Sequence, residues 1–287
     1  MLTLKAPAKL NLTLEVIGKR EDGFHKIRSI LQTVNLYDTL TFKVAEEIKI
    51  TSDNPDWIPR QSLVSTTTAL LREVTGCTRG AKIEVNKYIP LLSGLGGDSS
   101  NAAAVLRGLN EIWELELPLT TLLDLAARLG SDVSFFLYGG TALAEGKGEK
   151  ITPLPGFPHT WIILMMPPLP SEQNKTTRLY AGLKARSYTE GKITDAMIAL
   201  LFAGGEITDA YLYNVFDGVA RDNFAGIDEY WRQFLKAGAR TVHLSGSGPT
   251  LFALAEDKNQ AEEIYLNLWQ KGLESYLVEI LPAIEKL

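Results

Sequence analysis

Apolar and polar residues alternate along the beginning of the chain. Between Leu2 and Val16 apolar side chains occupy the even positions, while Lys9 and Asn11 share the other parity with mostly polar neighbours. A period of two is typical of a β-strand with one buried face. The pattern therefore predicts a strand on which Lys9 and Asn11 point the same way, off the core side.

The remaining chain mixes both kinds of periodicity. Period-two patterns and short apolar runs predict strands at about 27–36, 39–44, 81–89, 161–166 and 276–281, with strand-turn-strand units at 139–153 and 241–255. Spacing of three to four residues predicts helices at about 62–74, 99–113, 120–129, 133–137 and 258–270, with several more between 175 and 236. This order predicts an α+β fold without the regular alternation of a doubly wound sheet.

One stretch rich in proline and glycine interrupts these patterns, at positions 153–158. Such punctuation is typical of a boundary between domains. We therefore expect an N-terminal domain at 1–155 and a C-terminal domain at 156–287.

Composition narrows the function classes. A formal net charge of −5 argues against a general nucleic-acid binder. No apolar run approaches the ~20 residues of a membrane helix, and the alternating N-terminus does not resemble a signal peptide. The single cysteine, Cys77, excludes an internal disulfide and a cysteine-based metal site, and the three histidines lack ligand spacing. We expect a cytoplasmic protein, with no membrane or nucleic-acid partner and no metal held by its own side chains.

The strongest local signal is a glycine-rich loop at 90–103, PLLSGLGGDSSNAA. Its glycines allow a tight turn and a close approach to a ligand, and its paired serines are expected to cap a helix whose N-terminus favours phosphate. It lacks the Gly-Lys-Ser/Thr of a Walker A loop. The glycines alone would suit an ordinary strand-to-helix turn, but the serine pair and the small residues after it favour a phosphate site.

Two shorter signals are ambiguous by themselves. Ser245-Gly246-Ser247-Gly248 lies between two predicted strands and would suit a hairpin connection. Asp132 follows Gly130-Ser131 and would suit an early helix position.

Taken in order, these segments resemble the GHMP kinases over nearly the whole chain. The segments are PAKLNL at 7–12, DGFH at 22–25, the loop at 94–103, GSDV at 130–133, AEGKGE at 144–149 and SGSG at 245–248. The first two resemble the narrower group that phosphorylates a cytidine diphosphate derivative of methylerythritol, an isoprenoid precursor of the non-mevalonate pathway.

The resemblance implies a two-domain fold and a site for ATP with Mg²⁺. Family members have an N-terminal domain with a left-handed βαβ crossover and a ferredoxin-like C-terminal domain. By this likeness Lys9 and Asp132 form the catalytic pair, in which Asp132 orients the acceptor hydroxyl and takes its proton late. The residues expected at the ATP phosphates are Pro90, Gly94, Leu95, Gly96, Gly97, Asp98, Ser99 and Ser100.

The same resemblance implies a pocket for the cytidine end of the substrate. His25 matches the residue that hydrogen-bonds the cytosine edge, Phe24 would stack on the ring, and Tyr180 would close the other side. Asn11 and the loop residues Ser245, Gly246 and Ser247 complete the expected substrate contacts. Family members occur in more than one oligomeric form, so a monomer and a homodimer are both expected possibilities.

Three positions depart from the family pattern. Phe24 stands where tyrosine is usual, Ser62 where asparagine is usual, and Asp98 where glycine is usual. A carboxylate pointing into the loop would repel ATP, so Asp98 either faces solvent or helps to hold a cation.

Other functions remain open at this point. A different GHMP kinase, acting on homoserine, mevalonate or a sugar, would share the loop but would not need Phe24 and His25. A regulator that only binds nucleotide would be expected to lack Lys9 or Asp132, and both are present. A scaffold or sugar-binding protein would make the glycine-rich turns coincidental.

Overall fold

The computed structural model describes residues 1–170, 174–205 and 208–284. Its contacts divide the chain into two compact units. The first unit comprises Met1–Ala8, Leu36–Leu91 and Gly96–Gly139, and the second comprises Lys9–Asn35, Leu92–Leu95 and Gly140–Leu287. Each unit is built from several separate stretches of the sequence, whereas the predicted domains, 1–155 and 156–287, are continuous. The predicted boundary therefore stays a prediction.

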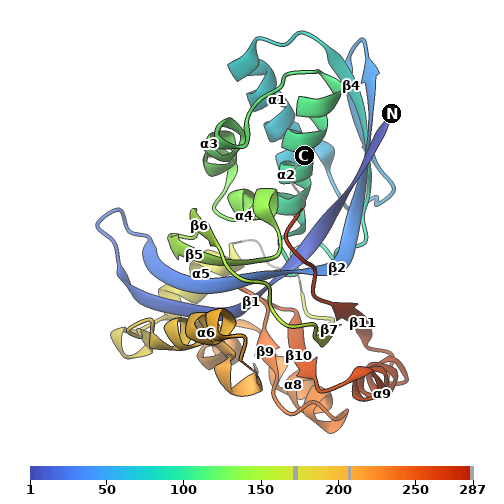
Figure 1. Cartoon of the computed structure of the whole chain (residues 1–287). Helices are drawn as coiled ribbons and strands as arrows, with labels where there is room; N and C mark the ends of the chain where they lie inside the picture. Colours follow the sequence, from blue (N-terminus) through green and yellow to red (C-terminus); the bar gives the residue numbers. More distant parts are fainter. Residues whose placement is uncertain (171–173, 206–207, 285–287) are drawn as a thin grey trace. The chain divides into compact units, whose positions relative to one another are not determined.

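The first unit combines part of a sheet with a group of helices. Strand β4 (Gly80–Asn86) runs parallel to β3 (Ile48–Ser52) and antiparallel to the second half of β2 (His25–Ala45). The helices are α1 (Leu63–Thr75), α2 (Gly97–Ile112), α3 (Leu119–Leu129) and α4 (Val133–Tyr138), which lie together in Figure 1. A Cβ atom added to Gly108 of α2 would lie 2.6 Å from the ring of Phe42 in β2. Helix α2 therefore packs closely on the sheet.

The second unit contains two sheets. In one, the first half of β2 pairs with β5 (Thr141–Gly146), β5 pairs with β6 (Lys150–Pro153), and the second half of β1 (Leu2–Lys19) pairs with β8 (Tyr213–Asn214). The other has the order β11 (Glu274–Glu279), β7 (Trp161–Met166), β10 (Leu251–Ala255), β9 (His243–Leu244) and is antiparallel. The helices are α5 (Lys175–Gly182), α6 (Lys192–Ala203), α7 (Ala220–Asn223), α8 (Ile227–Lys236) and α9 (Lys258–Trp269).

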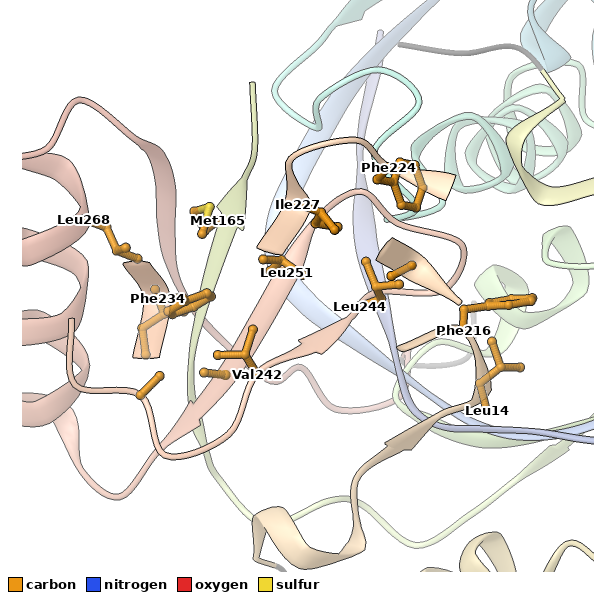
Figure 2. Close-up of a cluster of buried hydrophobic side chains, with 14 of the residues drawn as sticks. Leu14, Met165, Phe216, Phe224, Ile227, Phe234, Val242, Leu244, Leu251 and Leu268 are labelled. Atoms are coloured by element: carbon orange, nitrogen blue, oxygen red, sulfur yellow. The ribbon is translucent and has the colours of Figure 1, made fainter. Parts of the chain in front are cut away.

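A hydrophobic cluster fills the second unit. Figure 2 shows side chains that extend from Leu268 of α9, past Phe234 of α8 and Leu251 of β10, to Leu244 of β9 and Leu14 of β1. Each large apolar side chain buried in this way contributes about 1.5–3 kcal/mol. Leu244 ends β9 and Leu251 begins β10, so this core anchors both ends of the glycine-rich segment between them.

The α+β composition and most predicted elements are confirmed, and the strand predicted at 161–166 coincides with β7. One predicted break is wrong, because β2 continues unbroken from His25 to Ala45. Asp38, at that break, is fully buried within the strand. Its carboxylate accepts hydrogen bonds from the amides of Tyr88 and Ile89 at 2.8 and 2.9 Å, which satisfies a polar residue inside the sheet.

The polar face of β1 is buried as well, so the expectation that Lys9 and Asn11 point off the core side is wrong. Both are 5% exposed, and Thr13 and Glu15 are fully buried. Partners on α6 explain the burial of Thr13 and Glu15. The Thr194 hydroxyl lies 2.9 Å from that of Thr13, and the Thr194 amide donates to Glu15 at 2.8 Å. Hydrogen bonding lets this polar face leave water.

None of the helices in the described part of the chain combines the length and apolar character that a membrane span requires.

Candidate functional site

Lys9 belongs to a buried network of side chains in the second unit. Its Nζ donates a hydrogen bond to Asn11 Oδ1 at 2.5 Å, and Asn11 Nδ2 donates to Ser29 Oγ at 2.7 Å. Ser29 Oγ in turn donates to the Thr13 carbonyl at 2.5 Å. Each member fixes the next, so the Lys9 ammonium is held in one place and is not a solvated strand lysine.

The segment Ser245–Gly248 lies against this network. Gly246 has a φ of 55°, and a Cβ atom there would lie 3.0 Å from Lys9 Nζ and 3.1 Å from Asn11 Oδ1. Glycine is therefore required for the backbone to approach so closely. The structure thus brings together Lys9, Asn11 and Gly246, which the sequence had suggested separately.

The beginning of the predicted phosphate loop joins the same group. The Lys9 amide donates to the Leu95 carbonyl at 2.9 Å, and Ser245 Oγ donates to the Gly94 carbonyl at 3.3 Å. A Cβ atom at Gly94 would lie 2.4 Å from the Ser245 carbonyl oxygen. Ser247 Oγ accepts from Thr176 Oγ1 at 2.9 Å, which ties the segment to α5.

Three residues outside the motifs support this segment. Asn214 is buried and donates Nδ2 to the carbonyls of Leu244 and Gly246 at 2.9 and 2.8 Å. Asp217 accepts from the Leu244 amide at 2.9 Å and pairs with His243 Nδ1 at 2.7 Å. Burial raises the pKa of Asp217, and the contact with His243 partly offsets that rise.

Lys175, at the start of α5, is the fourth residue that sequence reasoning missed. No local sequence pattern indicates a functional role for Lys175, because a lysine at the start of a helix is normally expected to be exposed to solvent. Asn214 and Asp217 lie in an irregular stretch, and only their spatial neighbours identify them.

In the first unit, the predicted phosphate site is the start of α2. The prediction that the paired serines cap this helix is wrong. Gly96, with a φ of 75°, is the N-cap, and Ser99 and Ser100 lie within the helix. The left-handed glycine lets the helix begin early, and the Ser100 amide donates to the Gly96 carbonyl at 2.9 Å.

The start of α2 has polar groups suited to an anion. The first amides of a helix lack intrahelical acceptors and carry the positive end of its dipole. Ser100 is 1% exposed, and its hydroxyl has no hydrogen-bond partner within the described residues. A phosphate oxygen would satisfy both kinds of donor, so these residues fit the group that the sequence predicts there.

Asp98 is turned toward a neighbouring helix. It is exposed, and its Oδ2 accepts a hydrogen bond from the Leu63 amide at 3.2 Å, at the first residue of α1. Of the two sequence-based alternatives, this placement favours the solvent-facing one. Partial loss of hydration raises the pKa of Asp98, against the lowering effects of Leu63 and Lys87.

Ser62 occupies the N-cap position of α1, but its side chain makes no capping hydrogen bond to that helix. Its hydroxyl donates to the Pro59 carbonyl at 2.6 Å instead. The Asp98 carboxylate receives the first amide of the helix.

A buried ion pair supports the approach to the glycine-rich loop. Lys87 Nζ pairs with Asp38, and the two side chains are 2% and 0% exposed. Because Asp38 also binds the amides of Tyr88 and Ile89, it holds the three residues that precede Pro90. Pro90 itself is half-buried.

Asp132 lies in the first unit, at the N-cap position of α4. It is half-buried, and its carboxylate makes no capping hydrogen bond to that helix. Capping therefore does not account for an aspartate at this position.

The aromatic residues predicted for a base pocket lie in the second unit. The rings of His25 and Tyr180 are stacked, with centroids 4.8 Å apart and planes at 16°. Phe24 is 55% exposed, and the Lys147 ammonium lies 5.1 Å from its ring centroid. Burial and the charge of Lys19 lower the pKa of His25, so its ring is neutral at neutral pH.

Within the described residues, no group of three or more His, Cys, Asp or Glu side chains is placed to hold a metal ion.

Comparison with protein families gives two matches. Residues 62–140 match the N-terminal domain of GHMP kinases, and residues 200–274 match the C-terminal domain of GHMP kinases.

Curated relatives extend the likeness to nearly the whole chain. The chain is 48% identical over 285 residues to the 4-diphosphocytidyl-2-C-methyl-D-erythritol kinase of Dehalococcoides mccartyi, covering 99% of this chain and 100% of the relative. It is 38% identical over 273 residues to the enzyme of that name from Geobacillus kaustophilus, covering 93% and 92%.

Solved structures are similar as well. A crystal structure of 4-(cytidine 5'-diphospho)-2C-methyl-D-erythritol kinase has a TM-score of 0.82 and 30% identity, covering 97% of this chain and 99% of that one. A homoserine kinase from Cytophaga hutchinsonii has a TM-score of 0.76 at 18% identity, covering 98% and 95%, and shares the fold.

Proposed function

Because the chain belongs to the 4-diphosphocytidyl-2-C-methyl-D-erythritol kinases, a group of the GHMP kinases, we propose that it phosphorylates the 2-hydroxyl of that cytidine compound with ATP. The reaction is a step toward isoprenoid precursors. The two-domain GHMP fold expected from the sequence is confirmed by the same matches. The observation that carries the proposal is the buried Lys9–Asn11 pair against the Gly246 backbone, in a chain whose named relatives match over nearly their full length.

Lys9 and Asp132 are assigned to the acceptor hydroxyl. Phosphoryl transfer through a loose transition state requires mainly alignment and neutralisation of charge. The Lys9 ammonium, fixed by Asn11, supplies a preorganised positive charge for the attacking oxygen. Asp132 orients the hydroxyl and receives its proton as the bond to phosphorus forms. The motif match supports this pairing. Lys9 belongs to the second unit and Asp132 to the first.

The start of α2 is assigned to the ATP phosphates. The unpartnered Ser100 hydroxyl and the first helix amides are the donors that this assignment uses. Mg²⁺ commonly binds phosphate oxygens and retains water ligands. We therefore assign the ion to the phosphates of ATP, where it would neutralise charge during transfer of the γ-phosphoryl group to the acceptor hydroxyl, with ADP as the leaving group.

The cytosine is assigned to His25, Tyr180 and Phe24. A neutral imidazole carries one donor and one acceptor nitrogen, which suits the mixed edge of cytosine. Its contact with Tyr180 supports a stacking surface at this place. The base would replace or extend that stack, and Phe24 is exposed for a second face.

The experiment that tests the proposal is ADP release by the purified protein with Mg-ATP and three acceptors in parallel. The acceptors are 4-diphosphocytidyl-2-C-methyl-D-erythritol, mevalonate and homoserine. We expect turnover with the cytidine compound alone. Turnover with another acceptor would replace the proposed substrate, and ATP binding without any turnover would favour a regulatory protein.

A further inference from the structure

Lys175 is a buried lysine whose partners are backbone carbonyls. It is 9% exposed, and its ammonium donates hydrogen bonds to the carbonyl oxygens of Leu92 and Gly248. Hydrogen bonds from a charged donor are stronger than those between neutral groups. A single side chain on α5 therefore joins two segments that are far apart in the sequence.

Both partners belong to the segments that surround Lys9. Leu92 opens the stretch Leu92–Leu95, whose last carbonyl accepts from the Lys9 amide. Gly248 ends the loop whose Gly246 lies against Lys9 and Asn11. The ammonium of Lys175 thus connects the two backbone segments on either side of the Lys9 network.

The conformation of Leu92 indicates that this stretch is held in place. Leu92 has a φ of 54°, in the left-handed region, which is unfavourable for a residue with a side chain. Such a conformation persists where surrounding contacts enforce it. Leu92 is 54% exposed, so side-chain packing does little to restrain it. The restraints are the contact from Lys175 to its carbonyl and the hydrogen bond from the Thr250 amide to the adjacent Ser93 carbonyl at 3.2 Å.

Resting on the proposed function, we propose that Lys175 is a positioning residue of the kinase, which holds Leu92–Leu95 against Ser245–Gly248 and so fixes both segments around Lys9. The tolerance of that arrangement is small. A Cβ atom at Gly94 would lie 2.4 Å from the Ser245 carbonyl oxygen and 2.9 Å from that of Gly248. A shift of either segment would therefore disturb the backbone that contacts Lys9.

The charge of Lys175 is sensitive to pH in the range of an ordinary assay. Burial, and then the nearby positive charge of Lys9, lower its pKa to about 8. Among the described residues, Lys9 on β1 is the charged group that acts on it, while the segments of Leu92 and Gly248 present carbonyls. On α5 itself, Arg178 donates to the Asn223 carbonyl. Loss of the proton above pH 8 would weaken both contacts to carbonyl oxygen.

The first test is the pH profile of kcat for the wild type, Lys175→Met and Lys175→Arg. In the wild type we expect kcat to fall above about pH 8. Lys175→Met should lower kcat about tenfold at pH 7.5, equivalent to 1.4 kcal/mol, and should lack that alkaline fall. Lys175→Arg should keep its activity to higher pH, since guanidinium stays charged. Lys184→Met, at an exposed lysine just after α5, is the matched control and should retain the wild-type profile.

The second test does not need turnover. The pKa of Lys175 falls from 10.5 to about 8 on folding, so between these values the unfolded chain binds more protons than the folded one. Stability then rises with pH across this window. The melting temperature of the wild type should therefore rise relative to Lys175→Met by at least ~2 °C between pH 8 and pH 10. Lys175→Gln serves if the Met variant does not fold.

The two tests separate the two proposals. An unchanged alkaline fall of kcat in Lys175→Met, or a melting-temperature difference that stays flat with pH, would overturn the role of Lys175. A wild type that is inactive with the cytidine compound would overturn the proposed function, and the melting curves would still decide whether Lys175 is held as a buried, titrating ammonium.

Discussion

Two regions of the molecule differ in how their buried polar groups are hydrogen-bonded. One is the Lys9 network in the second unit, and the other is the start of α2 in the first unit. Asn11 and Ser29 are fully engaged with other protein groups, in a chain of hydrogen bonds that begins at Lys9. Ser100 is equally buried, yet its hydroxyl has no partner among the described residues.

The difference separates two kinds of site. A group that acts on charge in a transition state works best when the protein has already fixed it. A group that binds a ligand contributes more to affinity when it has no hydrogen-bond partner before the ligand arrives. Under the proposed assignment, the acceptor side is built in advance, and the phosphate side would be completed by ATP.

The largest expected effect comes from removing the charges of the proposed catalytic pair. Lys9→Met should lower kcat by about 10²–10³-fold, and Asp132→Asn by about 10²–10⁴-fold, with ATP affinity nearly unchanged. Turnover and nucleotide titration measure the two quantities separately. Near-normal turnover in either variant would remove that residue from the mechanism.

The second largest effect is expected from disrupting the buried Lys87–Asp38 ion pair, which supports the approach to the proposed phosphate site. Asp38→Asn leaves the buried Lys87 without its counter-charge and should cost about 3–5 kcal/mol of unfolding free energy. Urea unfolding measures that loss. The double variant Asp38→Asn/Lys87→Met should lose less than the sum of the two single changes, and full additivity would contradict the coupling of the pair.

A matched pair of serine variants sharpens the comparison directly. Ser100→Ala should change stability by less than about 0.5 kcal/mol and raise the KM for ATP about tenfold, because its hydroxyl is assigned to the ligand. Ser29→Ala leaves Asn11 Nδ2 unpaired and should cost about 1–3 kcal/mol of stability. If Ser100→Ala is the less stable of the two variants, the contrast between a hydrogen-bonded Lys9 network and an unsatisfied helix start is contradicted.

The smallest effect concerns the base pocket. Burial and Lys19 lower the pKa of His25 below 6.5, so its neutral form persists through neutral pH and is lost only as the pH falls below that value. The KM for the cytidine substrate should be flat from pH 8 to pH 6.5 and rise a few-fold below it. His25→Gln should remove this pH dependence, and a KM that already rises between pH 8 and pH 7 would contradict the assignment.

Local patterns predicted much of the fold. The alternation of β1, the apolar run of β7 and the glycine at the end of α3 are all signals that lie within a few residues of the element they define. The order of the motifs likewise identified Lys9, Asn11 and the loop at 245–248 before the structure brought them together.

What the sequence could not reveal depends on distant partners. Thr13 and Glu15 on the polar face of β1 are buried because Thr194, some 180 residues away, bonds to both. Asp98 points to Leu63, and Lys175 to Leu92 and Gly248, through contacts that leave no periodic trace. The cap of α2 was missed because a left-handed glycine can serve where serine is the usual residue.

The most direct test of the central claim is identification of the product by ³¹P NMR after reaction with Mg-ATP and 4-diphosphocytidyl-2-C-methyl-D-erythritol. We predict one new phosphomonoester for each ADP formed. The new phosphate should be on the 2-hydroxyl of the methylerythritol, and the cytidine diphosphate should stay intact. Release of inorganic phosphate without that phosphomonoester would contradict the claim, because it would reveal ATP hydrolysis without phosphoryl transfer to the acceptor.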